Sequence, residues 1–248
     1  MAVRIAQASH DEAGQYYNGQ AGDQTGSELN IRSWYSRPWD TLLRPNDQSL
    51  GIQIASVAQV LCNCYRIGYD QWQRTTLYDA CAAINWDLTR INSIALCECD
   101  CSSLIAVILR FCGISIPKTV YTGNLTSFLL ATGKFQCLRD PKYLTGDQYL
   151  RKGDFLLNTL HHVATVIDDG VNVSFSPYPA LVNVQSYLQV REGPGSQYLP
   201  FGVSNGDGTF TSWRLPPNAR IQIVDERDGW GRVGNTIGWV SLRYITKI

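Results

Sequence analysis

Cys99-Asp100-Cys101-Ser102-Ser103 stands directly before six apolar residues, 104–109. Aspartate and serine are residue types that begin helices, so the pattern predicts that Cys101 lies in the first turn of a buried helix. Free backbone N–H groups and the positive end of the helix dipole would then face the sulfur and favour the thiolate. Two of the chain's three histidines, His161 and His162, precede an apolar, strand-like segment. Either could complete a cysteine nucleophile.

The composition is that of an ordinary globular protein, with 44% hydrophobic and 17% charged residues in a chain of 248. This length suits one large domain, or one medium domain and a small one. The 21 basic and 21 acidic residues give a formal net charge of zero. Bulk attraction to nucleic acid or to an anionic membrane is therefore not expected to be the main activity.

The first residues lack the long apolar core of a secretory signal, and the best apolar run is interrupted at Arg110. We therefore expect a protein made and kept in the cytosol, with no membrane insertion. Its eight cysteines should then be mostly reduced. Several of them fall in apolar helical stretches, where cysteine acts as a small core residue.

The spacing of apolar residues changes along the first two thirds of the chain. Residues 1–46 are polar and rich in glycine, which predicts mostly loop with one or two short strands. Helical spacing then predicts helices near 47–65, from residue 71 to about 84, from 101 to before Gly113, and over 125–132. Strand-like segments follow at 155–157, 163–167 and 171–175. Helices followed by an antiparallel sheet predict an α+β domain over residues 1–178.

The last third of the chain has a different composition. Pro177-Tyr178-Pro179 marks a linker, after which short β segments alternate with turn residues. These segments cover residues 187–191, 220–224, 229–233 and 238–240. We therefore predict a small all-β barrel over residues 179–248, near the lower size limit for independent folding.

The first domain resembles the NlpC-type cysteine peptidases, which are papain-like hydrolases that cut bacterial cell-wall peptides. Asp100-Cys101-Ser102 matches their nucleophile motif, and His162-Val163-Ala164-Thr165-Val166-Ile167 resembles the strand that begins with their base. Gly153-Asp154 fits the pair that opens their preceding strand. Ala164 stands where glycine is usual. The N-terminal segment, including residues 22–26, is similar to the start of phage-encoded lysins of this kind.

The resemblance implies a nucleophile at Cys101 and a base at His162, which matches the motif better than His161. A third polar residue must orient the base. In the family it lies on the next strand, where this chain offers Asn172 or Ser174 in place of the usual histidine. We take Asn172 as the candidate on that strand.

Four further residues are candidates for contact with the substrate. Asp100 and Ser102 flank the nucleophile in sequence, while Asp23 and Gln24 belong to the N-terminal loop. Asp23 or Gln24 could also orient the base in place of a residue on the next strand. Both have an equally good explanation as turn residues.

A zinc site is an alternative for the cysteine cluster. Cys97, Cys99 and Cys101 alternate along the chain, and three thiolates with a histidine could bind zinc. Zinc-binding cysteines are usually separated by two to four residues, and the one-residue spacing here fits poorly. We therefore predict no metal and no other cofactor.

The C-terminal segment resembles the bacterial Src-homology-3-like barrel of cell-wall enzymes. The resemblance rests on residues 188–195, which contain a Val-Arg-x-Gly-Pro turn, and on the pairs Gly229-Trp230 and Gly238-Trp239. In that family the barrel holds peptidoglycan. Trp230 and Trp239 could line a groove or lie in the core, and the core is the expectation for Trp239. The aromatic side chains available for a wall-binding groove are then Trp213, Tyr198 and Tyr244.

These features predict a phage endolysin: a monomeric peptidoglycan hydrolase that cleaves a stem-peptide amide bond by a Cys–His mechanism. The predicted activity is that of an endopeptidase, and an N-acetylmuramoyl-L-alanine amidase on the same fold is the alternative. A non-catalytic wall-binding protein and a zinc-dependent hydrolase are two further classes. The expected partner is bacterial peptidoglycan and not nucleic acid. The resemblance implies that the enzyme stays in the host cytoplasm until a membrane lesion releases it to the wall.

Overall fold

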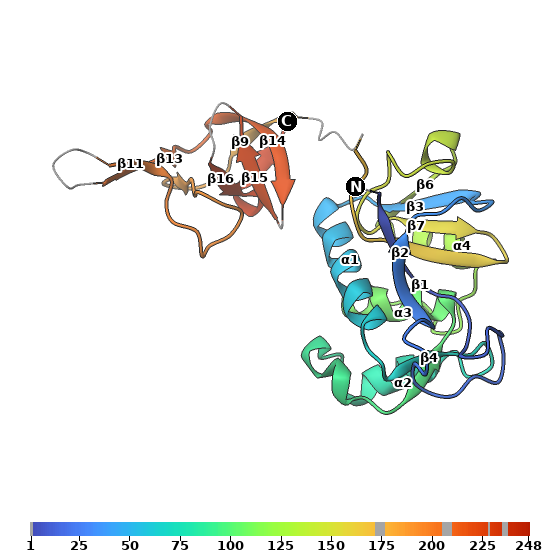
Figure 1. The fold of residues 1–248 in the computed structure, drawn as a ribbon. Helices are drawn as coiled ribbons and strands as arrows, with labels where there is room; N and C mark the ends of the chain where they lie inside the picture. The colour runs from blue at the N-terminus through green and yellow to red at the C-terminus, as the bar shows by residue number, and fades with distance from the viewer. Residues whose placement is uncertain (1, 172–176, 205–209, 228, 235–237) are drawn as a thin grey trace. The chain divides into compact units, whose positions relative to one another are not determined.

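The computed structural model describes residues 2–171, 177–204, 210–227, 229–234 and 238–248. It divides into two compact units, Met1–Val173 and Ser174–Ile248, each described by itself below (Figure 1). The division falls between residues 173 and 174. No helix in the described part of the chain is long and apolar enough to cross a membrane.

The first unit is built on a six-stranded sheet in which all neighbouring strands run antiparallel, in the order β2-β1-β8-β7-β3-β6. Its strands are β1 (Arg4–Ala8), β2 (Leu29–Ser33), β3 (Thr41–Pro45), β6 (Phe135–Leu138), β7 (Phe155–Asn158) and β8 (His162–Val166). The helices are α1 (Gln48–Cys62), α2 (Thr76–Ala83), α3 (Cys101–Phe111) and α4 (Leu125–Ala131), with 3-10 turns at Leu88–Ser93 and Pro141–Tyr143. A parallel pair, β4 (Ile67–Tyr69) and β5 (Cys97–Cys99), lies outside the large sheet. Helices combined with a mostly antiparallel sheet agree with the predicted α+β class.

The N-terminal segment is mostly loop, as predicted, but it has one strand more than the one or two expected. It supplies three strands, and two of them, β1 and β3, lie inside the sheet with neighbours on both sides. β3 is buried along its whole length, and β1 is buried from Ile5 onward. Strands of five residues buried on both faces lack the alternation that marks a strand in sequence, which explains why the local pattern does not reveal them.

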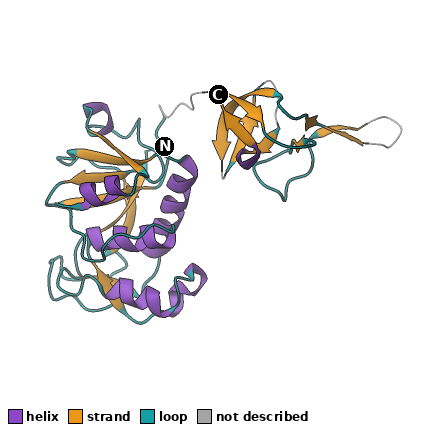
Figure 2. Cartoon of the chain, turned by 180° about the vertical axis from the view of Figure 1, so that it is seen from behind, coloured by secondary structure: helices purple, strands orange, loops and turns teal. Residues whose placement is uncertain are grey.

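Alternate residues of the sheet face two different apolar clusters. Ala6, Phe155 and Val163 pack in the larger cluster together with residues of α1 and α3. Ile5 and Ala164 pack in a smaller cluster on the other face, which loop aromatics cover. Figure 2 shows the helices (purple) beside the sheet (orange). α3 is buried on every side from its first residue through Leu109, so its N-terminus is fixed inside the unit.

A buried ion pair supports the start of β7. The Arg44 Nε and Nη2 atoms donate to Asp154 Oδ1 and Oδ2 at 2.9 and 2.6 Å, and the Arg151 N–H donates to Oδ2 at 2.7 Å. Gly153 precedes this aspartate with a φ of 81°, and a Cβ there would stand 2.3 Å from the Gly51 Cα. The Gly-Asp pair seen in the sequence therefore joins β7, β3 and α1.

Asp154→Asn should lower the free energy of unfolding by about 3–5 kcal/mol, because it leaves the Arg44 guanidinium buried and unpaired. The Arg44 and Asp154 side chains are 7% and 0% exposed, so water cannot replace the lost partner. Urea unfolding followed by circular dichroism measures the change. Asp168→Asn is the matched control, since its pair with Arg4 is exposed and should contribute little to stability. Equal effects of the two variants would contradict the prediction.

The second unit contains a five-stranded antiparallel sheet in the order β16-β15-β14-β9-β17. Its strands are β9 (Tyr178–Val182), β14 (Arg220–Arg227), β15 (Trp230–Val233), β16 (Trp239–Ser241) and β17 (Ile245–Lys247). Two short pairs accompany it: β10 (Leu188–Gln189) with β13 (Arg214–Leu215), and β11 (Gly202–Ser204) with β12 (Phe210–Ser212). A 3-10 turn covers Leu242–Tyr244.

The second unit departs from the sequence prediction in two ways. The segment expected to be a linker forms β9, which lies between β14 and β17; Pro179 has no N–H, but its carbonyl accepts the Ile248 N–H at 3.1 Å. The described residues also form an open sheet and not a closed barrel. In the part of the chain that the structure describes, one bridge between Arg191 and Trp239 extends the sheet beyond β16.

Candidate active site

Cys101 is the first residue of α3, as the sequence predicts, and Asp100 is the residue that caps this helix. Asp100 Oδ1 accepts the Ser103 N–H at 2.6 Å, and the Ser103 hydroxyl accepts the Asp100 N–H at 2.9 Å. This reciprocal capping box fixes where the helix begins. The sulfur is thus carried on the first turn of a helix whose position the core determines.

The Cys101 sulfur lies against the beginning of β8. The backbone N–H groups of Val163 and Ser102 lie close enough to it to lower the pKa of the thiol, and Val163 directly follows His162. The residue is 7% exposed. Residues 101 and 162 are far apart in sequence, but the fold brings the thiol next to the backbone of the proposed base.

The resting thiol is protonated, contrary to the expectation of a thiolate. Burial raises the pKa of Cys101 to about 12, and the negative charge of Asp100 raises it further. The Val163 N–H, the charge of Arg74 and the Ser102 N–H act in the opposite direction, but they do not offset desolvation. The helix start alone is therefore insufficient to ionise this cysteine.

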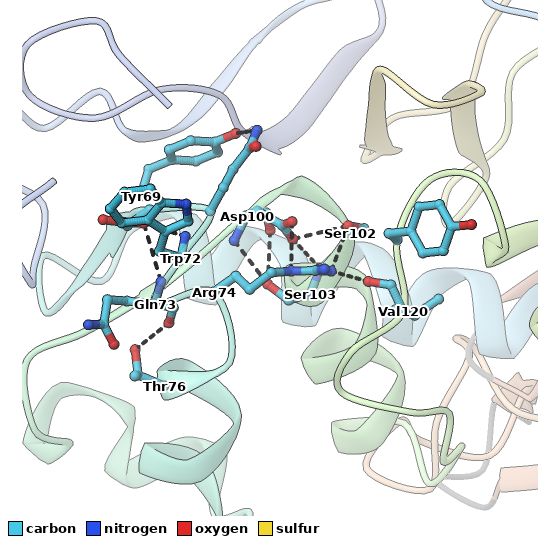
Figure 3. Close-up of polar contacts among 12 residues, drawn as sticks. Tyr69, Trp72, Gln73, Arg74, Thr76, Asp100, Ser102, Ser103 and Val120 are labelled. Atoms are coloured by element: carbon cyan, nitrogen blue, oxygen red, sulfur yellow. Dashed lines mark hydrogen bonds and ion pairs between the residues drawn. The ribbon is translucent and has the colours of Figure 1, made fainter. Parts of the chain in front are cut away.

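Arg74 contacts the polar residues on both sides of Cys101 in the sequence (Figure 3). Its Nε atom lies 2.8 Å from Asp100 Oδ2, and its Nη2 donates to the Ser102 hydroxyl at 3.2 Å and to the Val120 carbonyl. The Ser102 hydroxyl donates to Asp100 Oδ1 at 3.0 Å. Asp100 and Ser102, which the sequence suggests as substrate contacts, are thus already engaged with the helix cap and with Arg74. No local sequence pattern points to Arg74.

His162 is the first residue of β8, and its imidazole is held by a glutamine from the neighbouring strand β1. The His162 Nε2 atom lies 2.9 Å from Gln7 Oε1. The Tyr35 hydroxyl donates to the same oxygen at 3.1 Å, and Gln7 Nε2 donates to Asn30 Oδ1 at 3.3 Å. Because Oε1 is an acceptor, Nε2 of the imidazole carries the proton. The lone pair of His162 is then on Nδ1.

The imidazole is neutral at ordinary pH. Burial lowers the pKa of His162 to about 3, and the positive charge of Arg37 contributes in the same direction. The ring lies 6.0 Å from the buried Trp39 ring, centroid to centroid. A neutral histidine with a free Nδ1 lone pair is the form that can accept a proton from a thiol.

The side chain that contacts the His162 imidazole is that of Gln7, which the sequence interpretation missed. Asn172, the candidate on the next strand, lies outside the described residues. Gln7 is 3% exposed, and the one available signal was a polar residue inside the apolar run of residues 3–8. His161 is exposed, and its N–H donates to the Asn158 carbonyl in the turn between β7 and β8.

Asp23 and Gln24 form a turn in the N-terminal loop. Asp23 Oδ1 accepts the N–H groups of Thr25, Gly26 and Ser27 at 3.2, 2.7 and 3.2 Å. The Gln24 side chain donates to the carbonyls of the two residues before Asp23. These contacts match the turn role that their residue types allow.

The aromatic side chains proposed for wall binding lie at the surface of the second unit. Tyr198, Trp213 and Tyr244 are 42%, 44% and 43% exposed, whereas Trp239 is buried in this unit. The Trp213 ring packs edge-on against Phe201, with centroids 5.6 Å apart. This packing fixes the orientation of a tryptophan that still presents much of its ring to solvent.

Across the described residues, no group of three or more His, Cys, Asp or Glu side chains is arranged to hold a metal ion. Cys97 and Cys99 are buried in β5, and burial raises the pKa of each thiol. Buried protonated thiols behave as small apolar residues.

A family model described as the endolysin-like domain matches residues 5–173 of the chain. The match covers more than half of the chain and ends where the first compact unit ends. No curated protein matches the sequence. The thiol and the histidine both lie inside the matched region. The chain therefore belongs to the endolysin-like domain family, which identifies it as a cell-wall lytic protein of the phage endolysin type.

Proposed function

We propose that this protein cleaves an amide bond in the peptidoglycan stem peptide through a cysteine nucleophile. One observation supports the proposal: the Cys101 sulfur lies close enough to the backbone N–H of Val163 for that group to lower its pKa, and Val163 directly follows the histidine that Gln7 contacts. Membership of the endolysin-like domain family supports the substrate. The order of nucleophile and base also resembles that of NlpC-type peptidases.

The reaction begins from a neutral thiol and a neutral imidazole. As the sulfur attacks the carbonyl carbon, the proton passes from Cys101 to Nδ1 of His162. The tetrahedral intermediate expels the amine, which takes that proton, and leaves a thioester on Cys101. A water molecule then gives a proton to Nδ1 and attacks the thioester, which releases the carboxylate product and restores the thiol. Gln7 holds Nε2 throughout.

The backbone supplies the stabilisation of the oxyanion. The N–H groups in the first turn of a helix have no partner within that helix. The Cys101 N–H is one of these groups in α3, and it lies beside the sulfur that attacks. We assign it as one hydrogen-bond donor to the oxyanion. Such a donor stabilises the oxyanion most in a site from which water is excluded.

The bond that is cut is identified by the new chain ends. We expect an endopeptidase, whose digestion of purified walls would create new amino termini within the stem peptide. Mass spectrometry of the soluble products detects these termini. Free N-terminal alanine together with new lactyl ends on the sugar would show an amidase and would contradict the endopeptidase assignment. Digestion by neither route would contradict the proposed function itself.

We also propose that the second unit holds the wall while the first unit cuts it. Trp213, Tyr198 and Tyr244 expose aromatic rings suited to sugar and peptide surfaces. The support is this exposure together with the resemblance of the sequence to wall-binding Src-homology-3-like domains.

Gln7→Ala should lower kcat by roughly 10- to 100-fold and leave KM nearly unchanged, because the imidazole loses its orientation but the substrate loses no contact. Wall clearing at several substrate concentrations separates the two constants. Gln7→Asn is the matched control; it keeps the amide on a shorter side chain and should recover part of kcat. A change confined to KM would contradict the positioning role.

A further inference from the structure

A pocket of about 370 Å³ lies in the first unit, and neither Cys101 nor His162 is among its lining residues. Its lining combines two carboxylates, Asp70 and Glu98, with the large side chains of Trp72 and Leu96. The N-terminal loop, the segment after β4, the start of α2 and β5 all contribute to it. None of these lining residues has a part in the proposed chemistry.

Glu98 is buried in this lining without a partner for one of its oxygens. The residue is 4% exposed, and among the described residues its Oε1 atom has no hydrogen bond. The backbone around it is satisfied, because its N–H donates to the Thr76 hydroxyl at 2.8 Å and its carbonyl accepts from that hydroxyl at 3.1 Å. A carboxylate oxygen that is buried without a donor is unfavourable, and a ligand that supplies a donor would relieve it.

The charge around Glu98 is negative. Burial raises the pKa of Glu98 to about 7, and the carboxylates of Asp70, Glu12 and Glu28 raise it further. Asp70 Oδ1 accepts the N–H groups of Trp72 and Gln73, which hold that carboxylate at the pocket. A cation in the pocket would relieve the repulsion between these groups.

The other lining groups indicate whether the cation is a metal ion or an ammonium group. No described cluster of three metal-ligating side chains is present, whereas an ammonium group needs only acceptors for its three N–H donors. Trp72 is 72% exposed and packs against Tyr17 with tilted rings whose centroids are 5.5 Å apart, and Leu96 is 55% exposed. These apolar faces suit the methylene chain of an aliphatic amine, and the tryptophan ring also attracts its charge.

The pocket lies within peptide reach of the nucleophile. Glu98 precedes Cys101 by three residues, so their Cα atoms are separated by at most about 10 Å. An extended peptide of about three residues spans the same length. Trp72 is likewise two residues from Arg74, which contacts the cap of α3 (Figure 3).

We propose that this pocket binds the side-chain ammonium group of a diamino-acid residue in the stem peptide, within about three residues of the bond that is cut. The inference rests on the proposed function for the identity of the peptide. The carboxylates of Glu98 and Asp70 accept from the ammonium group, and Trp72 and Leu96 contact its methylene chain. The site therefore selects substrates whose diamino acid has a free side-chain amine.

Binding to the full chain tests the pocket without catalysis. In the Cys101→Ala background, L-alanyl-γ-D-glutamyl-L-lysine should bind at least tenfold more tightly than its Nε-acetyl form by isothermal titration calorimetry. Adding Glu98→Gln should remove this preference, and adding Asp79→Asn, an exposed carboxylate on α2, should preserve it. Equal affinity for the free and the Nε-acetyl peptide would overturn the proposal. Loss of affinity on acetylation of the alanine Nα, with no loss on acetylation of the lysine Nε, would also overturn it.

The pH dependence of binding separates a charge effect from misfolding. Affinity for the free amine should rise as the pH passes upward through about 7, where Glu98 ionises, and should stay level in the Glu98→Gln variant. A flat profile in the parent chain would overturn the role of Glu98.

Clearing of cell walls distinguishes this inference from the proposed function. The wild-type chain should clear untreated walls at least tenfold faster than walls whose amines have been acetylated. Clearing both at one rate would overturn the pocket assignment and leave the hydrolase intact. Clearing neither would overturn the hydrolase, and the calorimetric result would still decide the pocket.

Discussion

Cys101→Ala is expected to reduce wall-lytic activity by roughly 10⁴- to 10⁶-fold, because every covalent step of the proposed reaction forms or breaks a bond to this sulfur. The substitution removes one buried atom at the start of α3 and leaves the Asp100–Ser103 capping box in place. The cost to stability should therefore be small, about 1 kcal/mol. Clearing of a cell-wall suspension measures activity, and urea unfolding measures stability.

Cys112→Ala is the matched control for that experiment. Cys112 follows α3 at its other end, is half-buried, and has no place in the proposed reaction. It should clear walls at the wild-type rate. Equal clearing by the Cys101→Ala chain would remove the thiol mechanism and leave only a wall-binding protein or a hydrolase of another class.

His162→Gln should reduce activity by a similar factor, since glutamine keeps a polar contact with Gln7 but cannot take a proton from the thiol. The same variant has a second, opposite effect at acid pH. Burial lowers the pKa of His162 from 6.5 to about 3, so the unfolded chain binds a proton there more readily than the folded chain. This histidine therefore destabilises the fold progressively as the pH falls from 6.5 toward 3.

The acid effect can be measured as a difference between two chains. Between pH 6.5 and 4, titration of His162 should cost the wild type about 3 kcal/mol of folding stability, a cost that the glutamine variant lacks. The urea midpoints of unfolding of the two chains, recorded across this pH range, report the difference. The titration of all other groups is common to both chains and cancels. Parallel pH profiles for the two chains would show that the imidazole is not held neutral by burial.

The parts of the site that carry local signals could be predicted from the sequence. The start of α3 follows from capping residues beside an apolar run, and β8 follows from the apolar residues after His162. Gln7 could not be found in this way. It lies 155 residues from His162, on a strand that the local pattern did not reveal. Only the pairing of β1 with β8 brings the amide to the imidazole.

Burial is the second reason that the prediction fell short. The helix start favours a thiolate, but complete enclosure of the sulfur outweighs the dipole and raises the pKa of Cys101. In the second unit, prolines suggested a linker where β9 pairs with two strands, because the ladder also uses carbonyl groups, which proline retains. Local residue types report neither enclosure nor distant pairing.

The most direct test of the thiol–imidazole chemistry is a search for the acyl group on the enzyme. Wild-type protein is mixed with soluble wall fragments, quenched in acid during turnover, and mapped by peptide mass spectrometry. We predict a thioester adduct with the mass of a stem-peptide fragment on Cys101 and on no other cysteine, absent from the His162→Gln chain. Wall fragments cleaved at the normal rate without any adduct on Cys101, or with the adduct on another residue, would contradict the mechanism.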